Sequence, residues 1–198
     1  MGTFLMVLLV VVAVVLIYLI IIFNTLVSLR NRFLNGFSQI EVQLKRRHDL
    51  IPNIVNVAKQ AMTHERETLE AVVQARNSAA GLLQEAAKHP YSNRSIAELS
   101  QGESALNEAL MNLNVVMEAY PDLKTNETMM QLTEELSSTE NRVAFSRQSY
   151  NDSVMNYNTY RQSFPNVLIA NSFGHGMDAQ LLEFDDSAAI QSVPQVTF

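Results

Sequence analysis

The sequence predicts an all-α protein, in which an N-terminal transmembrane helix continues into an antiparallel, up-and-down helical bundle. Three observations predict this. Residues 4–23 read FLMVLLVVVAVVLIYLIIIF, with no charge, glycine or proline. Apolar residues then recur at alternating steps of three and four, the spacing of one helix face. Proline-containing and polar loops divide this pattern into segments, and links of about six residues favour antiparallel neighbours.

Residues 4–23 are expected to cross a membrane, leaving residues 1–3 as a short extracytoplasmic N-terminus. At about 1.5 Å per residue the run is roughly 30 Å long, which matches the hydrocarbon core of a bilayer. A cleaved signal peptide would need a basic start, a shorter apolar run and a small-residue cleavage site, and the sequence supplies none of these. Arg30 and Arg32 follow the run and no cation precedes it. Since basic flanks stay in the cytoplasm, we expect a single-pass inner-membrane protein with its bundle in the cytoplasm.

Residues 24–164 are expected to form the bundle. The first helix covers about 24–88, with a break near Pro52, because proline has no N–H to donate and its ring crowds the preceding turn. Two further helices are predicted at 95–120 and 125–164, each with an apolar seam of the coiled-coil type.

Helix starts can also be predicted. Ser95 and Glu98 fit a capping box, with Ser95 as the cap and Glu98 reaching back. Thr125 or Asn126 is positioned to cap the last long helix. The tail, residues 165–198, has no clear period but is too apolar for a simple disordered tail. We expect it to be partly docked on the bundle or on a neighbouring molecule.

The net charge of −6 is unevenly distributed. Residues 30–66 hold seven Lys or Arg against three Asp or Glu, a net charge of +4, whereas residues 165–198 hold none against four, a net charge of −4. Positive charge therefore lies near the membrane and negative charge far from it. Because the chain as a whole is acidic, a nucleic-acid partner is not expected.

The basic block Lys45, Arg46 and Arg47 has three interpretations. It can be a solvated helix face with ordinary salt bridges, a site for anionic lipid headgroups, or a contact for an acidic patch on another protein. In an upright rod Lys45 lies about 30 Å beyond the span, well past a Debye length of about 8 Å. We therefore interpret Lys45, Arg46 and Arg47 as protein-contact candidates, and Arg30 and Arg32 as the membrane-surface pair.

No motif for catalysis, a cofactor or a metal is found. The chain has no cysteine, which excludes thiolate sites and disulfides. No histidine has a glutamate three residues before it, as di-iron bundles require. His64-Glu65 begins an H-E-x-x-H motif, but Thr68 stands at its fifth position. The stretch SYNDSVMNYNTY (149–160) can be a ligand surface, but its tyrosines fall at helical spacing and favour packing.

Several stretches together resemble the bacterial LemA family. They are LVSLRNRF (26–33), FSQIEVQLKRRHDLIPNIV (37–55), HERETLEAVVQAR (64–76), EAYPDLK (118–124), TENRVAFSRQSYNDSVMNYN (139–158) and FPNVLIA (164–170). The resemblance implies a short outside segment, one membrane helix and a cytoplasmic antiparallel bundle, with no catalytic residues and no cofactor. Phe37 and Glu41 stand where family members commonly carry Trp and Asp.

The leading hypothesis is a membrane-anchored scaffold or adaptor without enzymatic activity. It would self-associate as a homo-oligomer and present its bundle to membrane or cytoplasmic partner proteins. The alternative is a non-catalytic accessory subunit of a membrane protease or another membrane enzyme complex. A third interpretation, an enzyme of unrecognised type, would need a polar pocket that no motif indicates.

Overall fold

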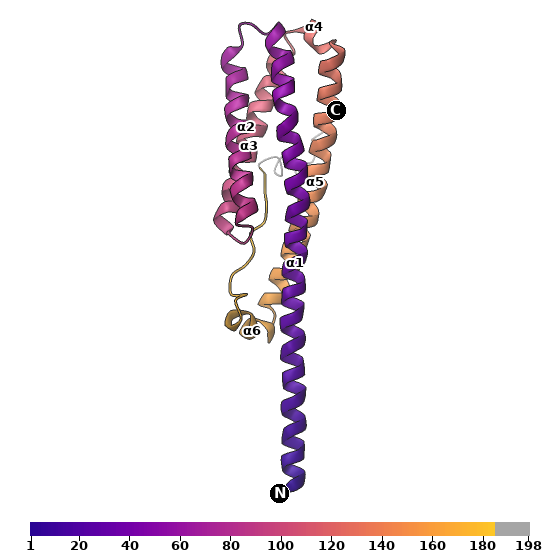
Figure 1. The fold of residues 1–198 in the computed structure, drawn as a ribbon, viewed down its shortest axis with the longest axis vertical. Coiled ribbons are helices and arrows are strands. Elements are labelled where there is room, and N and C mark those ends of the chain that lie inside the picture. Colours follow the sequence, from indigo (N-terminus) through magenta and orange to yellow (C-terminus); the bar gives the residue numbers. More distant parts are fainter. Residues whose placement is uncertain (185–198) are drawn as a thin grey trace, which may run out of the picture.

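A computed structural model describes residues 1–184. The chain is all-α, and the described residues contain no strand. Four long helices form an antiparallel bundle, and the first of them extends alone beyond it (Figure 1). The helices are α1 (Gly2–Ala61), α2 (Arg66–Lys88), α3 (Asn93–Met117), the single turn α4 (Pro121–Lys124), α5 (Glu127–Gln162) and α6 (Asn166–Ser172).

Helix α1 is continuous over 60 residues, a length of about 90 Å at 1.5 Å per residue. Every residue up to Ile21 is exposed, and Ile22 is the first buried one. Within residues 1–184, α1 is the one helix long and apolar enough to cross a membrane. The predicted apolar rod that enters the bundle is therefore present.

The break expected near Pro52 is wrong, because Pro52 lies inside α1, which ends only at Ala61. Proline cannot donate to the carbonyl of the residue four positions earlier, here His48. The Arg76 side chain on α2 takes over this bond, and its Nε donates to the His48 carbonyl at 2.8 Å. The first predicted helix is thus divided ten residues later than expected, at the turn between Ala61 and Arg66.

Of the two predicted N-terminal helix caps, one is wrong and one is confirmed. The capping box on Ser95 and Glu98 is wrong, since α3 begins earlier and is capped by Ser92. The Ser95 backbone N–H donates to the Ser92 hydroxyl oxygen at 3.2 Å. The predicted cap at Asn126 is confirmed, because its side-chain oxygen accepts from the Met129 N–H at 3.1 Å.

The core consists of two apolar clusters stacked along the bundle axis. The cluster nearer the apolar N-terminal run joins α1, α5, the docked tail and the adjoining ends of α2 and α3, and includes Phe33, Phe37, Leu44, Val143, Tyr150, Val154 and Tyr157. The distal cluster joins the other ends of the helices and includes Ile51, Ile54, Val72, Leu106, Leu113 and Met129. Between them, Arg47 and His48 of α1 and Glu103 of α3 are buried polar side chains.

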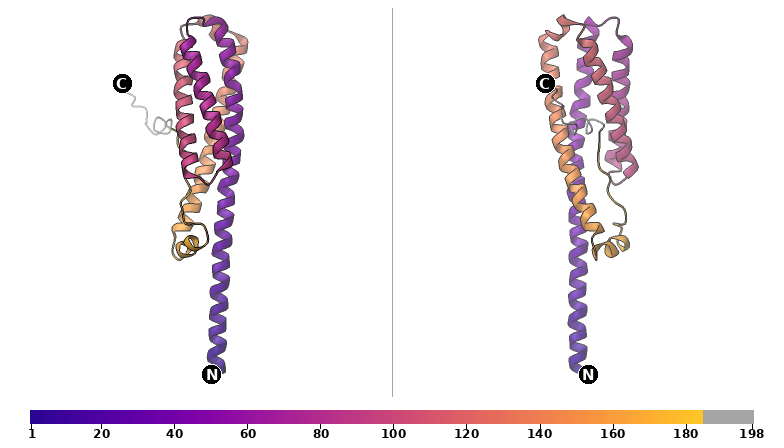
Figure 2. Two further views of the ribbon diagram at one scale, coloured as in Figure 1. Left: turned by 60° about the vertical axis from the view of Figure 1, so that its left-hand side comes forward. Right: turned by 180° about the vertical axis from the view of Figure 1, so that it is seen from behind.

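The tail docks on the bundle as far as it is described. After α6 the chain turns back and runs along α5 toward the middle of the bundle (Figure 2). Leu182 and Phe184 are buried there, with 0% and 4% of their surface exposed. The part of the predicted tail from residue 185 to residue 198 lies outside the described residues.

Candidate functional site

A layer of buried charge separates the two apolar clusters. We call Arg47, His48 and Glu103 the polar layer; their exposed fractions are 3%, 2% and 0%. Arg47 Nη1 donates to Glu103 Oε2 at 3.1 Å, and His48 Nε2 lies 2.7 Å from Glu103 Oε1. Arg47 Nη2 also donates to Asn107 Oδ1 and, at 3.3 Å, to Glu140 Oε1. One guanidinium therefore ties α1 to both α3 and α5.

The structure divides the predicted basic block. Lys45 is exposed, and Arg46 forms a half-exposed ion pair of 2.8 Å with Glu135 of α5. For Arg47 the expected surface contact is wrong, because its side chain is buried within its own chain. The helical phase explains this result: successive residues on a helix point about 100° apart, so three consecutive cations cannot share one face.

The predicted membrane-surface pair lies just beyond the apolar run. Arg30 is half-buried, with its guanidinium carbon 4.0 Å from the centre of the Tyr91 ring. Arg32 is exposed. The two arginines are therefore not equivalent, because one of them packs against the turn between α2 and α3.

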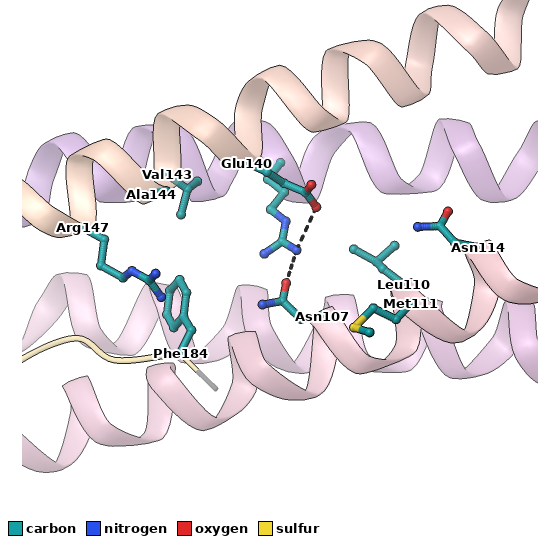
Figure 3. A pocket seen from close by; sticks show the side chains of 10 residues that line it. Asn107, Leu110, Met111, Asn114, Glu140, Val143, Ala144, Arg147 and Phe184 are labelled. Atoms are coloured by element: carbon teal, nitrogen blue, oxygen red, sulfur yellow. Dashed lines mark hydrogen bonds and ion pairs between the residues drawn. The ribbon is translucent and has the colours of Figure 1, made fainter. Parts of the chain in front are cut away.

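An open groove runs between α3 and α5 over the polar layer, and we call it the α3–α5 groove. It contains a cavity of about 260 Å³ and, toward the α4 end, a second of about 800 Å³. Asn114 lines both cavities, so they lie next to each other along the groove. Figure 3 shows the first cavity, with Asn107 and Glu140 facing the polar layer and Arg147 beside Phe184 at one end.

Methionines and small polar side chains line the α3–α5 groove together with charged ones, which are Arg47, Glu118, Lys124, Glu134, Glu140 and Arg147. Met111 and Met130 are 68% and 52% exposed, whereas Met117 and Met129 lie buried at its base. Methionine is unbranched and flexible, so it adapts to differently shaped apolar partners.

The tail of the chain is an extended segment, which asparagines of α5 hold and which reaches one end of the α3–α5 groove at Phe184. Asn151 of α5 donates to the Leu182 carbonyl at 3.1 Å and accepts from the Leu182 N–H at 2.9 Å. Asn158, seven residues on, makes the same pair with Ala179, at 2.9 and 2.8 Å. Each amide thus satisfies both backbone groups of one residue, as a neighbouring β-strand would.

For residues 149–160 we predicted that the tyrosines pack in the bundle, and the structure confirms this. The role of the asparagines in holding the tail was not predicted. Tyr150 and Tyr157 are buried, and burial raises the pKa of both phenols. Tyr150 also donates to the Gln180 carbonyl at 2.9 Å. The spacing of Asn151 and Asn158 by two helical turns was the one sequence signal that an extended tail segment docks on this helix.

The polar layer brings together one histidine and one carboxylate, and no group of three or more His, Cys, Asp or Glu able to hold a metal ion occurs within residues 1–184. No local sequence pattern indicates that Glu103 is the partner of the basic block. It lies on another helix, 55 residues from His48, and the pattern shows only that it falls on the apolar seam of α3.

Comparison with known proteins supports the resemblance seen in the sequence. The model of the LemA family matches residues 36–198, which include all of the bundle apart from the start of α1. No curated protein matches the chain at a significant level. Because the matched region covers most of the chain, including the polar layer and the groove above it, the protein belongs to the LemA family.

Proposed function

We propose that this protein is a membrane-anchored adaptor that holds an apolar, extended segment of a partner protein in the α3–α5 groove. The exposed N-terminal third of α1 is the anchor, and Arg30 and Arg32 keep the bundle on the cytoplasmic side. In this proposal the protein performs no chemistry and takes no cofactor.

One observation carries the proposal: the chain's own extended tail already reaches the groove, with Phe184 in the lining of the first cavity. Phe184 is the last described residue, and it lines the first cavity beside Arg147. Beyond it the groove continues over both cavities, about 260 and 800 Å³. On α3, Asn107 and Asn114 repeat the seven-residue spacing with which α5 holds the tail. The Asn107 oxygen already accepts from Arg47, so the groove offers another extended segment the Asn107 amide N–H groups, the Asn114 amide and the methionines.

Site-specific crosslinking in native membranes tests this proposal. The chain has no cysteine, so a photoreactive label can be attached to single cysteines of the full chain. We expect Asn114→Cys, inside the groove, to give a protein adduct of defined mass. Asn112→Cys is the matched control, because it is exposed on the same helix but does not line the groove. Equal adducts at the two positions, or none at Asn114, would contradict the proposal.

Self-association is a second part of the proposal. A span without charged residues and a long rigid rod favour lateral contact between copies in the bilayer. We expect a defined oligomer of the full chain in detergent, measured by light scattering. A monomer at all concentrations would contradict self-association, and it would not bear on the proposed binding in the α3–α5 groove.

A further inference from the structure

An uncharged hairpin projects from the membrane-proximal end of the bundle. Residues 163–177, which we call the apolar hairpin, connect α5 through α6 to the docked tail and contain no Asp, Glu, Lys or Arg. Charged residues appear directly at its base, where Arg161 pairs with Asp178. Arg161 Nη1 also donates to the Gly176 carbonyl at 3.1 Å, and Gln162 Nε2 donates to Asp178 Oδ1 at 3.0 Å. The hairpin is therefore held closed at its base.

One face of the apolar hairpin packs on the last turn of the apolar run. Ile169 and Ala170 are buried in the same cluster as Ile22 of α1. The Phe23 ring lies 5.8 Å from the Phe173 ring, edge to face. Figure 1 shows α6 beside α1 at the level where the bundle gives way to the single helix. The hairpin is thus level with the end of the segment that enters the bilayer.

The other face of the apolar hairpin is exposed and strongly apolar. Phe164, Leu168, Phe173 and Met177 are 82%, 61%, 63% and 78% exposed. A cluster of large apolar side chains in water marks an interaction surface. The one titratable group within the hairpin is His175, and burial, followed by the charge of Arg30, lowers its pKa. The imidazole is therefore neutral at physiological pH and adds no charge to this surface.

We propose that the apolar hairpin is a second membrane contact, which inserts Phe164, Leu168 and Phe173 into the boundary between headgroups and acyl chains. This proposal rests on the membrane anchoring by α1 proposed above. Lipid is the occupant because the exposed face continues the lipid-facing surface of α1 at the height where the span ends. Phe and Leu on one face of a short element are typical of interfacial contacts. With two contacts, the bundle is fixed relative to the membrane and cannot pivot freely about α1.

Depth-dependent quenching tests this inference on the full chain reconstituted in liposomes. Single cysteines replace Leu168, Phe173, Phe145 or Val12 in the cysteine-free chain and carry an environment-sensitive fluorophore. Phe145 is the matched control, since it is an aromatic residue of the bundle with 74% of its surface exposed, well away from the hairpin. Val12 lies in the middle of the apolar run and reports whether α1 is in the bilayer.

We expect a lipid-bound nitroxide near the headgroups to quench the label at positions 168 and 173 several-fold more strongly than the label at position 145. Quenching at position 12 by a deep nitroxide, with none at 168 and 173, would overturn the hairpin contact and leave the anchor intact. No quenching at any position would overturn both. Labels at 168 and 173 that are shielded from water but insensitive to the lipid quencher would show that another protein copy covers the hairpin, which also overturns the proposal.

Discussion

Removing the carboxylate of the polar layer is expected to destabilise the bundle strongly. In Glu103→Ala, Arg47 and His48 lose their shared partner while they remain 3% and 2% exposed. Breaking a buried ion pair from one side typically costs about 3–5 kcal/mol. Arg47 keeps its bonds to Asn107 and Glu140, so we expect the lower end, about 3 kcal/mol. For a chain of this size that corresponds to a fall in Tm of about 6–12 °C.

The assay is thermal unfolding of the full chain in detergent, followed by circular dichroism. Glu135→Ala is the matched control, because it removes the half-exposed partner of Arg46 and should cost about 0.2–1 kcal/mol. The double change Arg47→Met with Glu103→Leu should recover much of the loss, since a well-packed apolar pair often replaces a buried ion pair without cost. If Glu103→Ala and Glu135→Ala unfold at the same temperature, the polar layer is not the stabilising element argued here.

Three further predictions concern other parts of the fold. Arg76→Ala should lower the free energy of unfolding by about 1–3 kcal/mol, because it leaves the buried His48 carbonyl without a donor. In a Pro52→Ala background the loss should be much smaller, because the new backbone N–H at position 52 donates instead. Denaturant titration of the chain with and without Arg76→Ala, in each background, measures this. Burial lowers the pKa of His175 in the folded chain, so below about pH 6.5 the unfolded chain binds more protons than the folded chain. Stability should therefore fall as the pH drops from there, and it should fall less in His175→Asn. Gly81→Ala should raise stability by about 0.5–1 kcal/mol, whereas Gly36→Ala should give no such gain, because its Cβ would lie 3.2 Å from the α5 backbone.

Each of these predictions has a contrary result. Equal losses from Arg76→Ala in the two backgrounds would show that the arginine does not replace the missing donor. An acid dependence of stability that is unchanged in His175→Asn would assign it to other groups. Equal gains at the two glycines would show that α1 and α5 approach less closely at Gly36 than the structure indicates.

Local sequence rules predicted the helices of this fold and most of the loops between them, but they misplaced the break in the first predicted helix. The rule that proline breaks a helix considers only the backbone donor. Here the lost donor is replaced from another helix, by Arg76, and a tertiary contact of this kind leaves no mark near Pro52. The real end of α1 at Ala61 precedes Thr63-His64-Glu65, a stretch without proline or glycine.

The candidate site was harder to predict than the fold because its parts come from separate helices. Helical spacing placed Leu44 and Ile51 on the core face, and Arg47 and His48 lie between them on the same face. The sequence therefore contained the phase that buries these two residues. The sequence did not indicate which carboxylate pairs with these two buried side chains, since Glu103 on α3 becomes their partner only after the helices pair. The groove likewise depends on the spacing between α3 and α5, which no local pattern encodes.

The continuity of α1 also bears on which partners can reach the groove. Arg47 follows the end of the apolar run at Phe23 by 24 residues along one unbroken helix, so in the proposed arrangement, with α1 upright in the bilayer, it stands about 36 Å beyond the end of the span at 1.5 Å per residue. The second cavity lies further out still, toward α4. A partner confined to the bilayer cannot touch the groove at that height, whereas a soluble protein or a long cytoplasmic domain can. This geometry favours the adaptor over an accessory subunit that contacts only the transmembrane part of an enzyme. Capture of an enzyme's membrane-embedded segment by the label at Asn114 would contradict the argument, because it would require the bundle to lie flat on the membrane.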